Sequence, residues 1–492
     1  MSDLDKCLSE SELLDLSKIS SNIRKTIEYL RIEFDDIVVD SLLISVLSVI
    51  AQVCILGKIS VKASTKRLIQ GKDRNTLCNM YAITFMPSGE GKDKAVKLLL
   101  KTFCQPYFAL FNRFNSEYMI EQKYKIEAEA EQKFGDSAID MNRYKNEKEA
   151  RRLIPVVTDG TSEGLTSMRH SFQLAGFGGV TVRISEFGDF ILAENQARYD
   201  FMSIIGDMFD DGSTKAKVIK GDKVAVEIVG VPNNFFAHTS FYDLLEGSGN
   251  KKLKALFNRG FARRSFICFP QEYKYKRITT TQNDPRTSYL KDLEDEKIEN
   301  ELLSEIDDFF KNMTESFANI LLKPMPDLWL EMDTEILFRM YLEHNAVRIE
   351  KMNIFSEEAI RAEIKHRHWK ALKLSGMIAM FEHPDDLRVR LQDAQTAIYI
   401  AEFFGEHFGR FYKEEPGTAE ENLMNFFIAH ANEWIPMKNI KESNFVGKNK
   451  FNAWFKVFRP DLEKTLTEQG FSLQEYTAKH NIVNLRVVSN EL

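Results

Sequence analysis

A short stretch at residues 86–95, MPSGEGKDKA, combines glycines, a lysine and an aspartate in an order that suits phosphate binding. It lies between the apolar run YAITF (81–85) and the helix-like VKLLLKTF (96–103). A phosphate-binding loop requires this context, because loop N–H groups and the following helix N-terminus converge on phosphate oxygens. The pattern G-x-x-x-x-G-K-[ST] is met only in part, since Met86 replaces the first glycine and Asp93 replaces the hydroxyl residue.

The loop predicts a site for ATP. Gly89 and Gly91 permit the turn, and Lys92 reaches the β- and γ-phosphates. The alternative is a tight turn between a strand and a helix, without a ligand. The predicted nucleotide-binding residues are Pro87, Ser88, Gly89, Glu90, Gly91, Lys92, Asp93 and Lys94.

Such a site also needs a carboxylate at the end of a neighbouring strand, to hold Mg²⁺ and to orient the attacking water. The segment GGVTVRISEFGDF (178–190) contains an apolar strand that is followed by Ser185 and Glu186. Glu186 is the predicted general base, and Asp189 is a weaker candidate. Alternatively, both acids flank a solvated strand end.

The two departures from the pattern are complementary. Position 93 has a carboxylate where a hydroxyl is expected, and position 185 has a hydroxyl where a carboxylate is expected. We hypothesise that the Mg²⁺ ligands, Asp93 and Ser185, have been exchanged across the site, which preserves ligand types and charge. The rival hypothesis is a degraded site that does not hydrolyse ATP.

Further polar residues follow downstream. VGVPNNFF (229–236) places Asn233 and Asn234 at a predicted strand end, where they could sense the γ-phosphate. Arg263 or Arg264, in the acid-free segment 247–270, could complete the site of a neighbouring subunit in a ring. Three lysines of the same segment could contact a DNA backbone or lie on a solvated helix: Lys251, Lys252 and Lys254.

The elements that must position these residues alternate between strands and helices. Strands are expected at 81–85, 153–157, 180–184, 224–231 and 265–270. This alternation predicts an α/β fold with a largely parallel sheet. We expect four regions: an N-terminal helical region (1–75), the α/β core (76–275) with a charged helical hairpin at 117–152, a helical domain (276–413) and a C-terminal domain (418–492).

The C-terminal region has its own pattern. Helices, one of them interrupted at Pro460, precede the β-like runs FSLQEYT and IVNLRVV, which predicts a winged helix-turn-helix. This module commonly binds nucleic acids, and residues 437–460 carry six cationic residues against one acid. The predicted DNA-binding lysines here are Lys448, Lys450 and Lys456.

Composition limits the class of protein further. The 492 residues have a net charge of −7, so any attraction to DNA must come from local basic patches. Five scattered cysteines without a C-x-x-C pair argue against disulfides and zinc and fit a reducing cytoplasm. The N-terminus lacks the features of a signal peptide. Residues 37–56 are long enough to span a membrane, but Asp40 and Gln52 interrupt them, so a buried helix is expected.

The order of these motifs resembles that of a known family. PSGEGKDKA, TDGTSEGL (158–165), VRISEFGDF, VGVPNNFF and GFARRSFICFP together resemble the RecA-like P-loop ATPase family known as domain of unknown function 3987. This is the YfjI-like, primase-associated group common in phages and other mobile elements. The similarity covers about residues 30–412, with TDGTSEGL similar to the family's T-D-A-T-P-E-x-L motif.

The resemblance implies a RecA-like core that forms a ring, such as a hexamer, and hydrolyses ATP in DNA replication. It assigns nucleotide binding to Gly89, Gly91 and Lys92, catalysis to Glu186, and a finger role to Arg263 or Arg264. The expected function is a phage-type helicase or motor on single-stranded or forked DNA, with any primase on a separate chain. Two other functions stay open: an ATP-binding adaptor or loader that scarcely hydrolyses, and a structural ring protein.

Overall fold

The computed structural model comprises two compact units, Met1–Arg410 (unit 1) and Phe411–Leu492 (unit 2). We describe each unit by itself. The structure describes the chain except for residues 1–2, 9–12, 35–36, 65–67, 69–74, 87–92, 136, 148–152, 159, 177, 193–195, 211, 214–227, 240–252, 254–259, 271–296, 299, 314, 316–326, 353–357, 414–422, 424–425, 428–432, 443–450, 469–470, 479–481 and 490–492.

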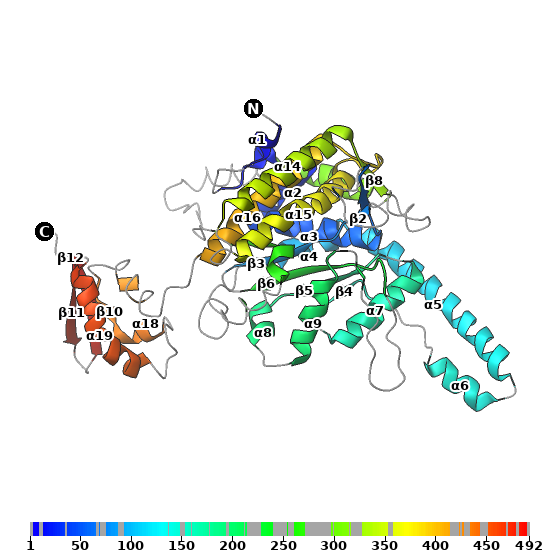
Figure 1. Cartoon of the computed structure of the whole chain (residues 1–492). Coiled ribbons are helices and arrows are strands. Elements are labelled where there is room, and N and C mark those ends of the chain that lie inside the picture. Colours follow the sequence, from blue (N-terminus) through cyan, green and yellow to red (C-terminus); the bar gives the residue numbers. More distant parts are fainter. Residues whose placement is uncertain are drawn as a thin grey trace. The chain divides into compact units, whose positions relative to one another are not determined.

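The centre of unit 1 is a five-stranded parallel sheet, which confirms the predicted α/β class (Figure 1). The strand order is β4-β5-β6-β3-β7. The strands are β3 (Tyr81–Phe85), β4 (Val156–Val157), β5 (Val180–Ile184), β6 (Asn233–Thr239) and β7 (Ser265–Cys268). Strands β3, β5, β6 and β7 are buried along their length, as expected for a parallel sheet covered on both faces.

One described strand lies further along the chain than the expected run. Of the run 224–231, residues 224–227 lie outside the described part, and the described strand β6 begins at Asn233. The run NNFFAHT forms the inner strand, and its phenylalanines pack on both faces of the sheet. Phe235 contacts Tyr81 and Phe261, whereas Phe236 faces Arg183.

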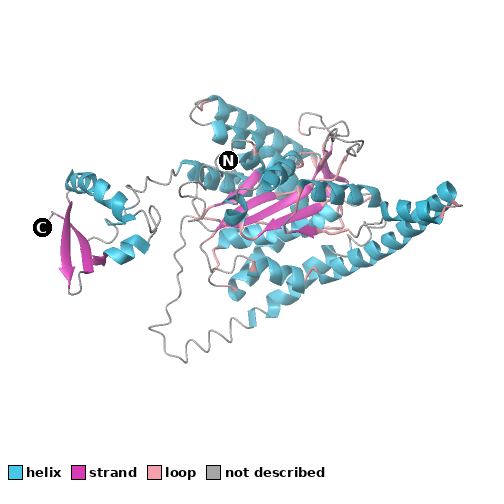
Figure 2. Cartoon of the chain, turned by 90° about the horizontal axis from the view of Figure 1, so that it is seen from below, coloured by secondary structure: helices cyan, strands magenta, loops and turns pink. Residues whose placement is uncertain are grey.

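Helices cover both faces of this sheet (Figures 1 and 2). One face carries α3 (Val39–Leu56) and α4 (Lys94–Thr102), which pack against each other. The other face carries α7 (Ser162–Ala175), α8 (Phe187–Leu192) and α9 (Gln196–Asp207). The short α12 (Phe261–Arg264) leads directly into β7.

Helix α3 is the apolar segment that could be mistaken for a membrane span. It is long and apolar enough to cross a membrane, but 89 % of it is buried inside the protein, so the prediction of a buried helix is confirmed. Its serines satisfy their hydroxyls locally, for example Ser45 Oγ donates to the Ser41 carbonyl at 2.8 Å. Gly178 lets the chain before β5 pass close to the end of α3, because a Cβ there would lie 1.7 Å from the Ile55 carbonyl oxygen.

A charged helical hairpin extends away from the sheet, as predicted (Figure 1). It consists of α5 (Gln105–Phe134) and α6 (Ala138–Glu147), which contact each other. The chain reverses near Gly135, the break that the sequence shows. The hairpin lies between α4 and β4 in the sequence, so it is an insertion in the α/β core.

A second sheet joins segments that are far apart in the sequence. Its order is β2-β1-β8-β9, with β2 (Asn75–Leu77), β1 (Ser60–Lys62), β8 (Asp327–Leu330) and β9 (Arg388–Val389). The domain at 276–413, which was predicted to be helical, therefore also contributes the short strands β8 and β9. These strands have two to four residues, too short for a periodic signal.

The helices of this region are α14 (Met332–Glu350), α15 (Glu358–Glu382) and α16 (Leu391–Lys413). A buried ionic network joins α15 to α16: Arg367 contacts Glu363 and Glu402, and Lys370 contacts Glu363. Burial opposes ionisation of Glu363, but the charges of Arg367 and Lys370 lower its pKa to about 2. Arg367 Nη1 donates to Glu402 Oε2 at 2.7 Å, so a charge-assisted hydrogen bond links α15 to α16.

Unit 2 contains β10 (Ile435–Pro436), α18 (Met437–Glu442), α19 (Phe451–Glu468), β11 (Phe471–Ala478) and β12 (Ile482–Ser489). Its sheet has the order β10-β12-β11 and is antiparallel. Contrary to our expectation, α19 continues through Pro460. Buried Phe455, Leu462 and Leu466 recur on one helical face, and this packing outweighs the hydrogen bond that proline removes.

Candidate functional site

The candidate site lies at the carboxyl edge of the five-stranded sheet. From β3 the chain crosses over to β4 at one end of the strand order, whereas from β6 it crosses over to β7 at the opposite end. The connections that follow the neighbouring strands β3 and β6 therefore run in opposite directions along the sheet. In open parallel sheets, ligands bind outside the carboxyl ends of the strands at such a point.

Asp93 lies at this position, at the N-cap of α4. An N-cap aspartate usually accepts hydrogen bonds from the first N–H groups of its helix. The Asp93 side chain makes no such bond. Its Oδ1 instead lies 3.7 Å from Nε2 of His238 on β6, and its Oδ2 lies 3.9 Å from Nζ of Lys97. Oδ1 is buried and has no hydrogen-bond partner among the described residues.

Arg183 on β5 is the second member of this polar cluster. Its side chain is 8 % exposed, rests against the Phe236 ring at 5.6 Å, and donates from Nη2 to Gln52 Oε1 at 3.4 Å. Burial lowers the pKa of Arg183 to about 10, and the negative charge of Asp93 opposes this shift. Within the described part of the chain, Nε and Nη1 of Arg183 have no hydrogen-bond partner.

The register places these groups on one face of the sheet. Arg183 is paired with Phe236, and Thr84 is paired with His238. Phe236 and His238 are two residues apart on β6, so all four side chains point to the same side. This is the face covered by α3 and α4, since Gln52 belongs to α3. Thr84 Oγ1 is also buried without a described hydrogen-bond partner.

Ser185 and Glu186 follow β5 directly, so they lie at the same carboxyl edge as Asp93. Both residues are exposed, as is Asp189 in the first turn of α8. The sheet thus brings the two residues of the hypothesised exchange to one edge. No cluster of three or more His, Cys, Asp or Glu side chains that could hold a metal occurs in the parts of the chain that the structure describes.

The prediction that Asn233 and Asn234 lie at a carboxyl strand end was wrong. They are the first residues of β6 and lie at the amino edge, opposite to Asp93. Both are fully buried and bind the core: Met80 N–H donates to Asn234 Oδ1 at 2.9 Å, and Tyr81 Oη donates to Asn233 Oδ1 at 2.8 Å. Their side-chain amides form hydrogen bonds to the residues around β6, so neither side chain is placed to contact a γ-phosphate.

Arg263 and Arg264 also lie at the amino edge, because α12 immediately precedes β7. Arg264 Nη2 contacts Asp210 Oδ2 at 3.0 Å. Burial and the charge of Arg264 lower the pKa of Arg263. Within one chain, these arginines are therefore at the opposite edge from Asp93, and a finger role is possible only between chains.

Several predicted residues lie outside the described part: Pro87, Ser88, Gly89, Glu90, Gly91, Lys92, Lys251, Lys252, Lys254, Lys448 and Lys450. Lys94, which begins α4, and Lys456 on α19 are both exposed. The sequence analysis missed Arg183, His238 and Thr84. The available signal was a polar residue near the end of each apolar run, in VTVRI, FFAHT and YAITF.

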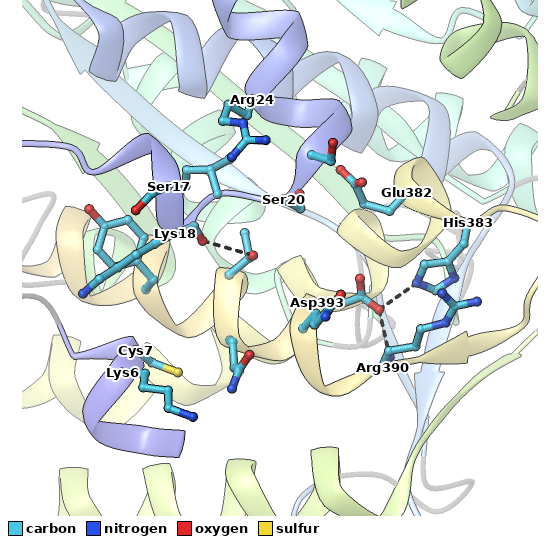
Figure 3. Close-up of a pocket in the computed structure, with 16 residues that line it drawn as sticks. Lys6, Cys7, Ser17, Lys18, Ser20, Arg24, Glu382, His383, Arg390 and Asp393 are labelled. Carbon is cyan, nitrogen blue, oxygen red and sulfur yellow. Dashed lines mark hydrogen bonds and ion pairs between the residues drawn. The ribbon is translucent and has the colours of Figure 1, made fainter. Parts of the chain in front are cut away.

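Unit 1 also contains a cavity of about 470 Å³ (Figure 3). It lies between α1 (Asp3–Cys7), η1 (Leu16–Lys18), α2 (Ser21–Glu33) and the α15–α16 connection. Its two acids act as helix caps: Glu382 accepts from the N–H groups of Asn22 and Ile23, and Asp393 accepts from the N–H of Arg390. Both carboxylates therefore have structural partners at helix ends. The residues that line the cavity include none of the predicted site residues.

Comparison with known proteins gives no match to any family model, and no curated protein has significant sequence similarity to this chain.

Proposed function

We propose that unit 1 is a P-loop ATPase with a RecA-like core, and that the protein is a phage-type replicative DNA helicase or helicase-like motor. The position of β3 is the observation that carries this proposal. The sequence PSGEGK joins β3, an inner strand of a parallel sheet, to α4 at the point where the strand order reverses. This is the context in which a phosphate-binding loop works.

The chemistry follows from the strand order. Lys92 and the N–H groups of residues 87–92 hold the triphosphate of ATP in this proposal. Glu186 stands at the end of β5, which is separated from β3 by β6. Because neighbouring strands lie about 4.8 Å apart, β3 and β5 are about 10 Å apart, which leaves room for a phosphoryl group and a water. Glu186 orients this water for attack.

The residues at this edge fit a Mg²⁺ ion that arrives with ATP. Magnesium usually takes one or two protein ligands and completes its shell with phosphate oxygens and water. Asp93 offers a buried Oδ1 without a described hydrogen-bond partner, and Ser185 offers an exposed hydroxyl. The ion neutralises phosphate charge. Arg183, whose Nε and Nη1 have no hydrogen-bond partner among the described residues, adds a fixed cation beneath the site.

One observation favours a second function, an ATP-binding adaptor, loader or structural ring protein. Asp93 is already attracted by the charge of Arg183, so a cationic group of the protein can neutralise it without a metal. A site of this kind would hold a nucleotide and hydrolyse it slowly.

The remaining parts of the proposal concern assembly and partners. A ring, such as a hexamer, lets Arg263 or Arg264 of one subunit stabilise transition-state charge in its neighbour. In unit 2, helices that precede a small antiparallel sheet support a winged-helix DNA-binding module. The proposed partners are single-stranded or forked DNA and a separate primase or replication protein. The proposed location is the cytoplasm, of a host cell if a phage encodes the protein.

ATP hydrolysis with and without single-stranded DNA tests the proposal. We expect slow hydrolysis that DNA stimulates at least several-fold, and no stimulated rate in Lys92→Ala or Glu186→Gln. Lys101→Ala, an exposed lysine near the end of α4, is the matched control and should keep the rate. Binding of ATP without any hydrolysis would reject the motor and favour the adaptor.

A further inference from the structure

The sheet of unit 2 has one covered face and one open face. Ile435, Leu485 and Val487 are buried in the core of the unit, so they mark the covered face. Side chains alternate along a strand, so Trp434, which precedes Ile435, and Arg486, between Leu485 and Val487, point to the other face. Tyr476 shares this face, because it is paired with Asn484, the neighbour of Leu485.

These three side chains form a compact cluster, which we name the aromatic platform. Trp434 and Tyr476 are 43 % and 57 % exposed, and their ring centroids are 5.8 Å apart. The Arg486 guanidinium carbon lies 4.6 Å from the Trp434 ring centroid. Its Nη2 donates to Gln474 Oε1 at 2.8 Å, which fixes the guanidinium on the open face.

The surroundings of the platform are mostly polar. On the same face lie Ser472 and Gln474 of β11 and Asn484 of β12, together with the apolar Val488, which is paired with Ser472. A protein-docking hot spot is normally enclosed by well-packed contacts that exclude water. Here, two exposed rings and a stacked guanidinium instead share their face with three side chains that can hydrogen-bond to base edges, those of Ser472, Gln474 and Asn484.

We propose that the aromatic platform binds unpaired bases of single-stranded nucleic acid by stacking. Every base has a π-face, so exposed aromatic rings and arginine planes bind single strands with little sequence preference. Sheets with aromatic residues on an open face bind RNA in the same way. Duplex bases are already stacked within the helix and cannot reach a flat platform. Lys438, exposed in the first turn of α18 and four residues after Trp434 in the sequence, supplies a positive charge for the phosphates.

This site is distinct from the lysines that the sequence predicts to contact phosphates. Phosphate contacts change the salt dependence of binding, whereas base stacking changes affinity at every salt concentration. The inference concerns binding alone and does not depend on ATP hydrolysis by unit 1.

Fluorescence anisotropy with the full-length protein tests the platform, with labelled dT and rU oligomers and a DNA duplex as probes. Trp434→Ala and Tyr476→Ala should each weaken dT binding about 5- to 100-fold, with an unchanged salt slope and unchanged duplex affinity. Trp434→Phe and Tyr476→Phe keep a ring and should stay within about threefold of the parent protein. Equal losses for dT and rU assign the site to the bases and not to the sugar.

The control is Trp329→Ala in unit 1. Trp329 is 52 % exposed and lies beside a cation, with Lys62 Nζ 5.6 Å from its ring centroid, so it matches Trp434 without belonging to the platform. Thermal melts monitor folding of every variant. Three results would overturn the proposal: dT binding unchanged in both alanine variants, an equal loss for the duplex, or an equal loss in Trp329→Ala.

Discussion

Two buried arginines of unit 1 should respond to the same substitution with opposite signs. Arg169 on α7 is fully buried and well bonded: its Nε donates to the Val231 carbonyl at 2.9 Å and its Nη2 to the Gly212 carbonyl at 2.5 Å. Arg183 is also buried, at 8 % exposure, but its Nε and Nη1 have no hydrogen-bond partner in the described part of the chain.

The magnitudes follow from these contacts. Each unsatisfied buried donor costs about 1–3 kcal/mol, so Arg183→Met removes a cost of about 2–6 kcal/mol. It also loses a long bond to Gln52, worth about 0.5 kcal/mol, and a ring contact with Phe236, worth about 1–2 kcal/mol. Methionine retains the packing of the aliphatic stem. These figures leave a net stabilisation between about zero and 4 kcal/mol for Arg183→Met. Arg169→Met leaves the Val231 and Gly212 carbonyls without this donor and should destabilise by about 2–6 kcal/mol.

Urea unfolding of the nucleotide-free protein, followed by circular dichroism, measures both changes on the same transition. If Arg183 serves phosphate binding, Arg183→Met should also weaken ATP binding while it raises stability, a common trade-off at functional sites. Destabilisation of Arg183→Met by as much as Arg169→Met would refute the reasoning. The Arg183 guanidinium would then be a structural group with satisfied hydrogen bonds.

Three further outcomes are expected. Asp93→Ser and Ser185→Asp should each lower ATPase activity by tenfold or more, and the double variant should recover part of it; a double variant no better than the singles rejects the ligand exchange. Asn234→Leu should destabilise unit 1 by about 2–4 kcal/mol in urea and leave the ATP affinity of the folded protein unchanged, whereas a sensor role would show the reverse. Burial and the charge of His366 lower the pKa of His368 to about 4 in the folded protein, whereas the ordinary value of 6.5 applies in the unfolded chain. As the pH falls from about 6.5 towards 4, His368 is therefore protonated in the unfolded chain but not in the folded protein, and the free energy of unfolding decreases. At pH 5 this histidine should lower the free energy of unfolding by about 2 kcal/mol. In His368→Gln the urea midpoint should therefore depend less on pH, and an unchanged pH dependence of the midpoint contradicts this.

The sequence predicts the elements of the core better than their spatial neighbours. The runs YAITF and VTVRI are apolar over five residues and became β3 and β5. Their register is not visible in a single sequence, because it depends on the strand order. The cluster of Asp93, Arg183 and His238 therefore appears only once β6 is known to lie between β3 and β5.

The error at Asn233 has a specific physical cause. Two apolar runs, VAVEIVGV and FFA, flank PNN, and either run could have been the inner strand. The first assignment places the asparagines at a carboxyl end, and the second places them at an amino end. Burial decides the matter: β6 is buried from Asn233 to Thr239, and both amides are bonded within the core. Sequence periodicity contains no information on which run pairs with β3.

The central claim is that ATP binds at the carboxyl edge of the parallel sheet through Lys92. Isothermal titration of the purified protein with ATP and Mg²⁺ tests it most directly, with Lys92→Ala beside the control Lys101→Ala. The account predicts one ATP per chain, micromolar to submillimolar affinity for the parent protein and Lys101→Ala, and at least tenfold weaker binding for Lys92→Ala. Equal affinity in all three proteins, or no binding to the parent protein, would contradict it.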